Sequence, residues 1–555
     1  MNSAGWWMFH GDTCHTGEVA GSPIHSGNVG DLKLLHDILI PGPILSVPAL
    51  AGGKIYVGLA NTSGTPGVNG GRFLKIDAAS GRTEAEFHWH VAPGQGDTHG
   101  FMGMGCTPAV AGGKVYFSAF DGKLYCLDQE TLRLMWAVDL RNPDVVHGQP
   151  VSNTLLFNAG DPNAAGWSSP VVANGRLWVG MGEGENPALF GFVFCLDAET
   201  GNVIWIYCTC QFTPGVPNKP NVLPPSVVPG FVPSQFTVSP TNPPVRGCSV
   251  WASIAYDPSL DRIFLTTGNP APDGALPTPG FSNGILSLDA STGRFRGFFQ
   301  APPESSYRSS DTDVDFGGSP MLYTQNGKRI VAAGCKNGGF FLLDAANMTL
   351  LNQRQLLPYY NEGVKSQIPS VDPHVPADDD DLDPFVPNAV SNATQQENFY
   401  GTYSTPAVHT TLGRLFMGVG GNNYHNVAAG IDSTTTPFMR VMDWSTLNDA
   451  WPMDNNDPRR YSKPQPPMYT TPGESGLSSP AVVNDVVFFS TSIVALYAFD
   501  ANDGTLLWLD RLGMQTGGMN GGYGYCLGPA VEGKYVVAGG LVFGANGGVL
   551  RVYSI

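Results

Sequence analysis

The chain has 555 residues, of which 42% are hydrophobic and only 14% charged, and it contains 70 glycines and 46 prolines. Few charges, many turn-forming residues and frequent aromatic residues are typical of a compact all-β protein, and they exclude a disordered or mainly helical chain. The formal net charge of -17 argues against a nucleic-acid partner, which needs a basic surface, and the lack of an apolar run of about 18 residues argues against a membrane span.

The chain starts with MNSAGWW, which has neither the basic nor the apolar region of an export signal. We therefore expect that the chain either has no such signal or had it removed and replaced by an initiator Met. The segment that follows, GWWMFHGDTCHTG at 5–17, is a candidate strand.

A two-part repeat then recurs along the chain. The first part is a small residue, a proline and an alternating apolar strand, at 46–58, 106–118, 168–180, 318–334, 404–420, 478–491 and 527–540, with a variant at 252–268. The second part is an apolar strand, an Asp, a tight turn and a strand that often ends in Trp, as at 73–89, 123–136, 192–205, 285–299, 340–351 and 496–508. Period-2 alternation between turn residues predicts a hairpin for each part.

Two hairpins make a four-stranded blade, so this pattern predicts an all-β fold, a single eight-bladed β-propeller over 1–555. The final segment 548–555 is a lone strand. We expect the opening segment 5–17 to complete its blade, so that N- and C-terminal strands close the ring and remove exposed strand edges.

Two insertions interrupt the repeat. One, near 212–246, is rich in proline, and the other, near 358–400, carries four consecutive aspartates at 378–381. Both are expected to be loops on one face, and the acidic run is better explained as a solvated loop than as a calcium site.

The nine cysteines include no C-x-x-C and no C-x-x-C-H pattern, which argues against a zinc knuckle and a covalent c-type haem. Cys208, Cys210 and Cys248 flank the first insertion, and whether they form a disulfide is left open.

The hairpin Asp197-Ala198-Glu199-Thr200-Gly201, followed by Trp205, resembles the repeat of the propellers that bind pyrroloquinoline quinone (PQQ). That family includes methanol, ethanol and polyvinyl alcohol dehydrogenases, as well as non-enzymatic relatives that scaffold outer-membrane assembly. The repeat implies the fold but not catalysis, which depends on residues at the centre of the ring.

One long segment, VWASIAYDPSLDRIFLTTGNPAPD, resembles the part of the dehydrogenases that supports the cofactor. By this resemblance Trp251 forms an aromatic floor under the quinone, and Asn269 gives an amide oxygen to calcium. A planar tricyclic ring stacks on an aromatic plane, and a hard cation prefers oxygen ligands. A core tryptophan beside an ordinary Gly-Asn turn is the alternative.

Two further segments resemble the catalytic part of the family. Asp315, in SDTDVDFGGS, matches the aspartate that accepts the substrate's hydroxyl proton and that also contacts the metal. Lys336, in GCKNG, matches the basic residue that stabilises negative charge on the reactive quinone oxygen and binds the cofactor. An acidic loop and a surface turn are the respective alternatives.

The remaining matches are on the third repeat. Glu185, in VGMGEGE, matches a calcium-binding glutamate, with Glu183 as the alternative. Ser168 and Ser169 lie where the family's hydroxyl groups bind the carboxylates of the cofactor.

The sequence also departs from the family. Methanol dehydrogenase-like enzymes cap the quinone with a disulfide between adjacent cysteines, whereas GMGCT here has only Cys106, so Met104 or Cys106 is expected to form that wall. The nearby cofactor-binding Arg is also missing. Lanthanide-dependent relatives add an Asp two residues after the catalytic one; Gly317 stands there, so calcium is the expected ion.

The resemblance therefore implies a PQQ- and calcium-dependent alcohol dehydrogenase that is periplasmic or secreted. Because the sequence has no haem motif, we expect electrons to pass to a separate acceptor such as a cytochrome c. The substrate is an alcohol, sugar, polyol or polymer that the sequence does not identify. The alternatives are a non-catalytic propeller that binds other proteins and, less well supported, a metal-dependent lyase or hydrolase.

Overall fold

The fold is known from a computed structural model. The structure describes residues 5–62, 70–91, 101–140, 145–146, 149–150, 166–182, 191–209, 222–223, 248–268, 281–301, 315–336, 338–356, 403–419, 439–452, 478–491, 495–511, 528–542 and 547–555.

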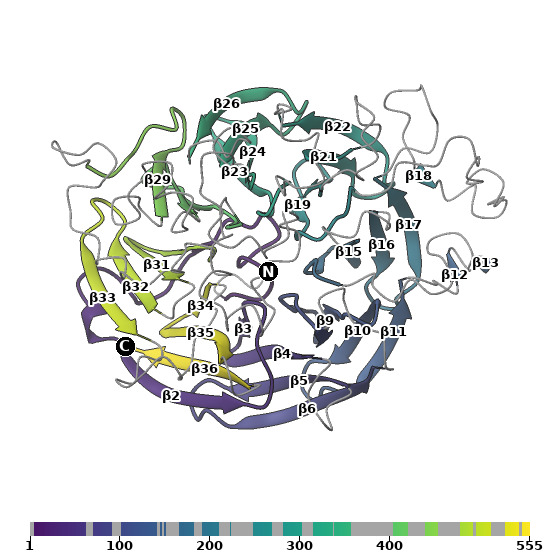
Figure 1. The fold of residues 1–555 in the computed structure, drawn as a ribbon, viewed down its shortest axis with the longest axis horizontal. Helices are drawn as coiled ribbons and strands as arrows, with labels where there is room; N and C mark the ends of the chain where they lie inside the picture. The colour runs from purple at the N-terminus through teal and green to yellow at the C-terminus, as the bar shows by residue number, and fades with distance from the viewer. Residues whose placement is uncertain are drawn as a thin grey trace, which may run out of the picture.

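Eight sheets, built mainly of antiparallel strands, stand in a ring around a central axis (Figure 1). The eight-bladed propeller predicted from the repeat is therefore confirmed. The first four blades are β3(Ala49–Ala51), β4(Lys54–Thr62), β5(Gly70–Asp77) and β6(Thr83–His90); β8(Ala109–Ala111), β9(Lys114–Ser118), β10(Lys123–Asp128) and β11(Leu134–Asp139); β14(Val171–Ala173), β15(Arg176–Met181), β16(Phe192–Asp197) and β17(Val203–Cys208); and β19(Ala255–Asp257), β20(Arg262–Thr266), β21(Gly284–Asp289) and β22(Phe295–Gln300).

The other four blades continue in chain order. They are β23(Met321–Gln325), β24(Lys328–Gly334), β25(Gly339–Asp344) and β26(Leu350–Gln355); β27(Ala407–His409), β28(Arg414–Gly418) and β29(Met439–Asp443); β30(Ala481–Val483), β31(Val486–Thr491), β32(Ala495–Asp500) and β33(Leu506–Arg511); and β34(Pro529–Glu532), β35(Tyr535–Val542) and β36(Gly547–Ser554), with β2(Lys33–Ile40) as its outer strand. Short elements are β1(Glu18–Val19), η1(Val29–Asp31), β7(Phe101–Gly103), β12(Val145–Val146), β13(Gln149–Pro150) and β18(Val222–Leu223).

The Asp-Thr-Gly turn and the outer tryptophan of the repeat bind adjacent blades together. In the third blade, Asp197 Oδ1 accepts a hydrogen bond from the backbone N–H of Thr200 at 2.8 Å. Gly201 has a φ of +76°, and a Cβ on it would lie 2.8 Å from the ring of Trp136, which comes from the preceding blade. The turn therefore requires glycine both for its left-handed backbone and for close contact with the tryptophan.

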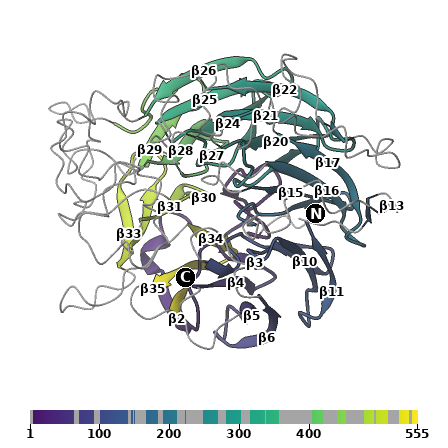
Figure 2. The ribbon, with the colours of Figure 1, turned by 45° about the vertical axis from the view of Figure 1, so that its right-hand side comes forward.

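The ring is closed by β2, which pairs antiparallel with β36 (Figure 1). In the turned view β2 again lies near the C-terminus (Figure 2). Closure by N- and C-terminal strands is confirmed, but the expectation that 5–17 supplies the closing strand is wrong. As an outermost strand, β2 leaves Leu34, Leu35 and Leu39 exposed. It therefore lacks the clean apolar alternation by which a half-buried strand is recognised in a sequence.

The opening segment instead lies near the axis, against the inner strands of successive blades (Figure 1). Backbone carbonyls of this segment accept hydrogen bonds from inner-strand N–H groups at 2.6 to 2.9 Å. The pairs are Trp6 with Leu50, Trp7 with Val110, Thr13 with Tyr256, Cys14 with Leu322, Thr16 with Val408 and Gly17 with Val482. This segment therefore runs along the inner strands of six of the eight blades.

A series of hydroxyl groups links neighbouring blades just before each inner strand. Each hydroxyl oxygen accepts a hydrogen bond from the backbone N–H at the equivalent position of the preceding blade, at 2.8 to 3.2 Å. The donor N–H and acceptor hydroxyl pairs are Thr107 with Ser169, Ser169 with Ser253, Ser253 with Ser319, Ser319 with Thr405, and Thr405 with Ser479. At these five junctions the hydroxyl residue that precedes the inner strand therefore has a structural function.

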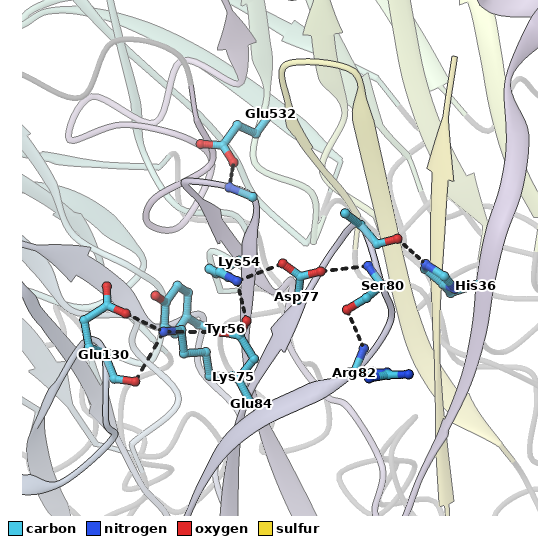
Figure 3. A network of polar contacts seen from close by, with 12 residues as sticks. His36, Lys54, Tyr56, Lys75, Asp77, Ser80, Arg82, Glu84, Glu130 and Glu532 are labelled. Carbon is cyan, nitrogen blue, oxygen red and sulfur yellow. Dashed lines mark hydrogen bonds and ion pairs between the residues drawn. The ribbon is translucent and has the colours of Figure 1, made fainter.

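The junction between the last blade and the first has Gly528 and Val47 at these positions and uses other polar contacts (Figure 3). Glu532 accepts hydrogen bonds from the backbone N–H groups of Gly52 and Gly53, at 2.8 and 2.7 Å. On the outer strand, His36 Nε2 lies 2.9 Å from the carbonyl oxygen of Ala79. The closing blade is thus joined to the first one at its inner turn and at its outer edge.

The insertions 212–246 and 358–400 fall outside the described residues, except that β18 pairs with β17. The single-domain organisation with loops at these places stays a prediction. No helix among the described residues is long and apolar enough to cross a membrane.

Candidate active site near the axis

Three residues predicted from distant parts of the sequence come together near the axis. Trp251 precedes β19, Asp315 precedes β23, and Lys336 follows β24. The indole N–H of Trp251 donates to Asp315 Oδ2 at 3.0 Å, and Lys336 Nζ lies 2.8 Å from Asp315 Oδ1. The side chains of Lys336 and Asp315 are 3% and 0% exposed, so the two opposite charges compensate each other in a site that excludes most water.

The ammonium group of Lys336 also lies between two aromatic rings. Its Nζ is 5.0 Å from the ring centroid of Trp251 and 5.2 Å from that of Tyr403. Both are cation–π distances. Sequence reasoning missed Tyr403, although it stands three residues before Pro406, as Trp251 stands three residues before Ile254 in the equivalent repeat.

The backbone around this cluster is held in place. The N–H of Lys336 donates to the carbonyl oxygen of Asp315 at 2.8 Å, which fixes the two residues relative to each other. Gly268 lies beside them, because a Cβ on it would be 3.1 Å from Asp315 Oδ2 and 2.2 Å from Ser249 Oγ.

Ser249 is a second residue that the sequence reasoning did not select. Its side chain is buried, at 2% exposure, and its hydroxyl has no hydrogen-bond partner among the described residues. A buried hydroxyl without a partner is costly in a folded protein. Its position beside Gly268 and Asp315 makes it a candidate to contact a bound group.

The other predicted cofactor contacts lie deeper in the blades. Ser168 Oγ accepts a hydrogen bond from the N–H of Gly180 at 3.0 Å, and Ser169 belongs to the series of hydroxyls between blades. Met104 and Cys106 are both in a hydrophobic core cluster. The Cys106 thiol donates to the carbonyl of Ser118 at 3.2 Å, and burial raises the pKa of this thiol to about 11.

The predicted metal ligands Glu185 (or Glu183) and Asn269 lie outside the described residues, as does the acidic run 378–381. Within the described part of the chain, no group of three or more His, Cys, Asp and Glu residues could hold a metal ion. The metal-binding roles of Glu185 and Asn269 therefore stay predictions, and Asp315 is the predicted ligand whose surroundings are known.

The cluster fits a planar, electron-accepting cofactor on three counts. Trp251 is half-buried and offers an aromatic face. Lys336 and Asp315 place one cationic donor and one anionic acceptor beside it, and the Ser249 hydroxyl is available for a further contact. Such a set can bind a quinone oxygen, accept a proton and contribute to a cation site.

Two family models match the chain. Residues 158–351 match "Glucose/ethanol/alcohol dehydrogenase, beta-propeller domain", and residues 41–161 match "Outer membrane protein assembly factor BamB". The first match includes Trp251, Asp315 and Lys336.

Curated relatives are quinone-dependent alcohol dehydrogenases. The dehydrogenase subunit of a quinone alcohol dehydrogenase from Gluconacetobacter polyoxogenes is 30% identical over 61% of this chain and 44% of its own length. The quinohemoprotein alcohol dehydrogenase ADH IIB from Pseudomonas putida is 25% identical over 91% of this chain and 70% of its own length. The chain thus spans less than half of the first relative.

Solved structures agree on the fold. The quinohemoprotein alcohol dehydrogenase from Comamonas testosteroni has a TM-score of 0.62 at 18% identity, covering 100% of this chain and 81% of its own. A europium-containing methanol dehydrogenase has a TM-score of 0.62 at 16% identity, covering 100% and 98%.

The chain is therefore an eight-bladed propeller similar to quinone-dependent alcohol dehydrogenases, and it carries an aromatic, charged cluster near its axis.

Proposed function

We propose that this protein is a PQQ-dependent dehydrogenase that oxidises an alcohol to a carbonyl compound. The observation that carries the proposal is the convergence of Trp251, Asp315 and Lys336. These residues come from two adjacent blades and are separated by up to 85 positions in the sequence. A propeller that acts only as a binding scaffold has no need for a buried ion pair against an aromatic face.

Each residue has a distinct role in this proposal. Trp251 supports the cofactor by stacking, and its N–H orients the carboxylate of Asp315. Asp315 accepts the hydroxyl proton of the alcohol, and Lys336 binds the reactive quinone oxygen and stabilises negative charge there. PQQ, when bound, supplies the electron-accepting quinone carbonyl for hydride from the alcohol carbon. Ser168, Ser169 and Cys106 remain proposed contacts of the cofactor.

The proposed ion is calcium. Glu185, Asn269 and Asp315 would hold it, since carboxylate and amide oxygens are the ligands that calcium prefers. Gly317 provides no extra negative charge two residues after Asp315, which favours a divalent over a trivalent ion. The europium-containing relative makes a lanthanide the competing ion in any test.

The proposal extends to a separate electron acceptor, such as a cytochrome c, to which the reduced cofactor would pass its electrons. It also includes a periplasmic or secreted location, as the family resemblance implies. The alcohol itself is to be identified by assay.

Reconstitution tests the proposal. Purified protein is mixed with PQQ and calcium, or with PQQ and a lanthanide, and the bound quinone is followed by its absorbance. A panel of alcohols with an artificial dye acceptor then reports turnover. We expect quinone binding and calcium-dependent dye reduction with at least one alcohol.

The key variant is Asp315→Asn, which we expect to bind PQQ but to abolish dye reduction. Its matched control is Asp257→Asn, because Asp257 is also fully buried and also paired with a cation, Arg329, but lies next to the opening segment. The control should reduce the dye as the wild type does. Turnover by Asp315→Asn at the wild-type rate would contradict the assignment of the base, and failure of the wild type to bind PQQ would contradict the function.

A further inference from the structure

Residues 13–15 of the opening segment lie against the two blades that carry the candidate site. Two of their backbone carbonyls accept hydrogen bonds, from the N–H of Tyr256 in β19 at 2.6 Å and from the N–H of Leu322 in β23 at 2.8 Å. Trp251 precedes β19, and Asp315 precedes β23. One short piece of chain is therefore bonded to both of the strands that follow these site residues.

His15 adds a side-chain contact at the same place. Its ring is fully buried, and its Nδ1 lies 3.0 Å from the carbonyl oxygen of Pro320. A carbonyl oxygen only accepts hydrogen bonds, so Nδ1 carries the hydrogen and donates it. Pro320 stands between Asp315 and β23, so this bond holds the segment that carries the proposed base.

Two further hydrogen bonds connect this segment to the rest of the cluster. The Ser319 hydroxyl accepts the N–H of Ser253 at 2.8 Å, and Ser253 is two residues after Trp251. The carbonyl oxygen of Asp315 accepts the N–H of Lys336 at 2.8 Å. A shift of the segment would therefore move the carboxylate relative to the indole and to the ammonium group.

His10 makes the same kind of contact on a blade without site residues. Its ring is also buried, and its Nε2 lies 3.0 Å from the carbonyl oxygen of Pro480. Pro480 directly precedes β30 as Pro320 precedes β23, but the blade of β30 holds none of the three cluster residues. The other ring nitrogen of His10 lies 2.7 Å from the carbonyl oxygen of His15, so loss of either histidine weakens the opening segment.

We propose that His15 is a positioning residue for the candidate site, because it fixes the segment of Asp315 relative to Trp251 and Lys336. The inference rests on the proposed function, which assigns the roles of these three residues. The cluster depends on separations of 3.0 and 2.8 Å between side chains of two blades. A misplacement of about 1 Å that starts far from the chemistry can cost about a hundredfold in rate. His15 acts through the backbone and not by contact with a reacting group.

The first test uses the protein without PQQ. Lys336 is 3% exposed and lies 2.8 Å from Asp315 Oδ1, so reductive methylation should label it slowly, as read by peptide mass spectrometry. His15→Leu should raise the labelling rate of Lys336 about fivefold, since loss of one hydrogen bond of about 1 kcal/mol raises the population of a locally open site by that factor. His15→Asn should be labelled as the wild type is, because its Nδ2 stands at the same position along the side chain as Nδ1 and can donate.

The matched control is His10→Leu, which should leave the labelling of Lys336 unchanged although it also weakens the opening segment. In protein reconstituted with PQQ and calcium, His15→Leu should reduce dye turnover about tenfold or more, whereas His10→Leu and His15→Asn should stay within about twofold of the wild type. Urea unfolding shows whether each variant is folded. If His15→Leu does not fold, His15→Phe replaces it with the same expectations, because it keeps a ring but lacks the donor.

Wild-type labelling of Lys336 in His15→Leu, or equal increases in His15→Leu and His10→Leu, overturns this inference alone. Failure of the wild type to bind PQQ overturns the proposed function, and the labelling rates still decide whether His15 positions the cluster.

Discussion

The buried pair of Lys336 and Asp315 makes a quantitative prediction for stability. At 2.8 Å and an effective dielectric constant of about 20, the direct attraction is about 6 kcal/mol, and part of it offsets the desolvation of both groups. Removing one partner leaves the other charge uncompensated. We expect Lys336→Met to lower the free energy of unfolding by about 3–5 kcal/mol.

A double-mutant cycle isolates the pair. Lys336→Met, Asp315→Asn and the double variant are unfolded in urea at pH 7, without added PQQ or metal, and followed by tryptophan fluorescence. Each single variant already removes the ion pair, so the double variant loses nothing further from it. The free energy of unfolding of the double variant should therefore be higher, by about 2 kcal/mol or more, than the value expected from adding the two single losses. A coupling energy below about 0.5 kcal/mol would show that the pair is not the interaction that the distances indicate.

Three further predictions follow from single side chains. Burial lowers the pKa of His15 to about 3 and that of His10 to about 4, from 6.5, so the unfolded chain binds both protons more readily. The contribution of His15 to stability is complete above pH 6.5 and falls by about 2 kcal/mol from pH 7.5 to pH 5, so His15→Asn should reduce the pH-dependent loss of unfolding free energy by about that amount, whereas the loss caused by His10 should remain. Gly293→Ala should lower the free energy of unfolding by more than the roughly 1 kcal/mol of backbone strain, because at a φ of +68° its Cβ would also lie 2.7 Å from Trp205. The control is Gly327→Ala, where the φ is +77° and the space is open. Equal losses of unfolding free energy in the two variants would contradict this reasoning. Tyr403→Leu should lower the unfolding free energy by about 0.5–2 kcal/mol more than Tyr403→Phe does, because the phenyl ring of the Phe variant keeps the cation–π contact with Lys336.

Some elements of the propeller could be predicted from local sequence patterns and others could not. The Asp-Thr-Gly turn and its tryptophan are short-range features of the sequence, and each is explained by one turn and one neighbouring blade, as at Gly201 and Trp136. The closing strand β2 could not be recognised in the same way, because an outermost strand has little burial to impose alternation. The opening segment was assigned to the wrong place because its hydrogen-bond partners, such as Leu50 and Val482, are on opposite ends of the chain.

The site likewise contains residues that the local sequence predicted and residues that it did not. The sequence by itself indicated three members of the site, since Trp251, Asp315 and Lys336 were each selected because their own segment resembles one of the family. It did not select Tyr403, because an aromatic residue before a strand looks like any core residue until its neighbours are known. Only the tertiary structure brought the Lys336 ammonium between two rings and placed the Ser249 hydroxyl beside Gly268. The physical reason is that a propeller builds its axis from one short segment per blade, so the contacts that define the site join residues that are remote in sequence.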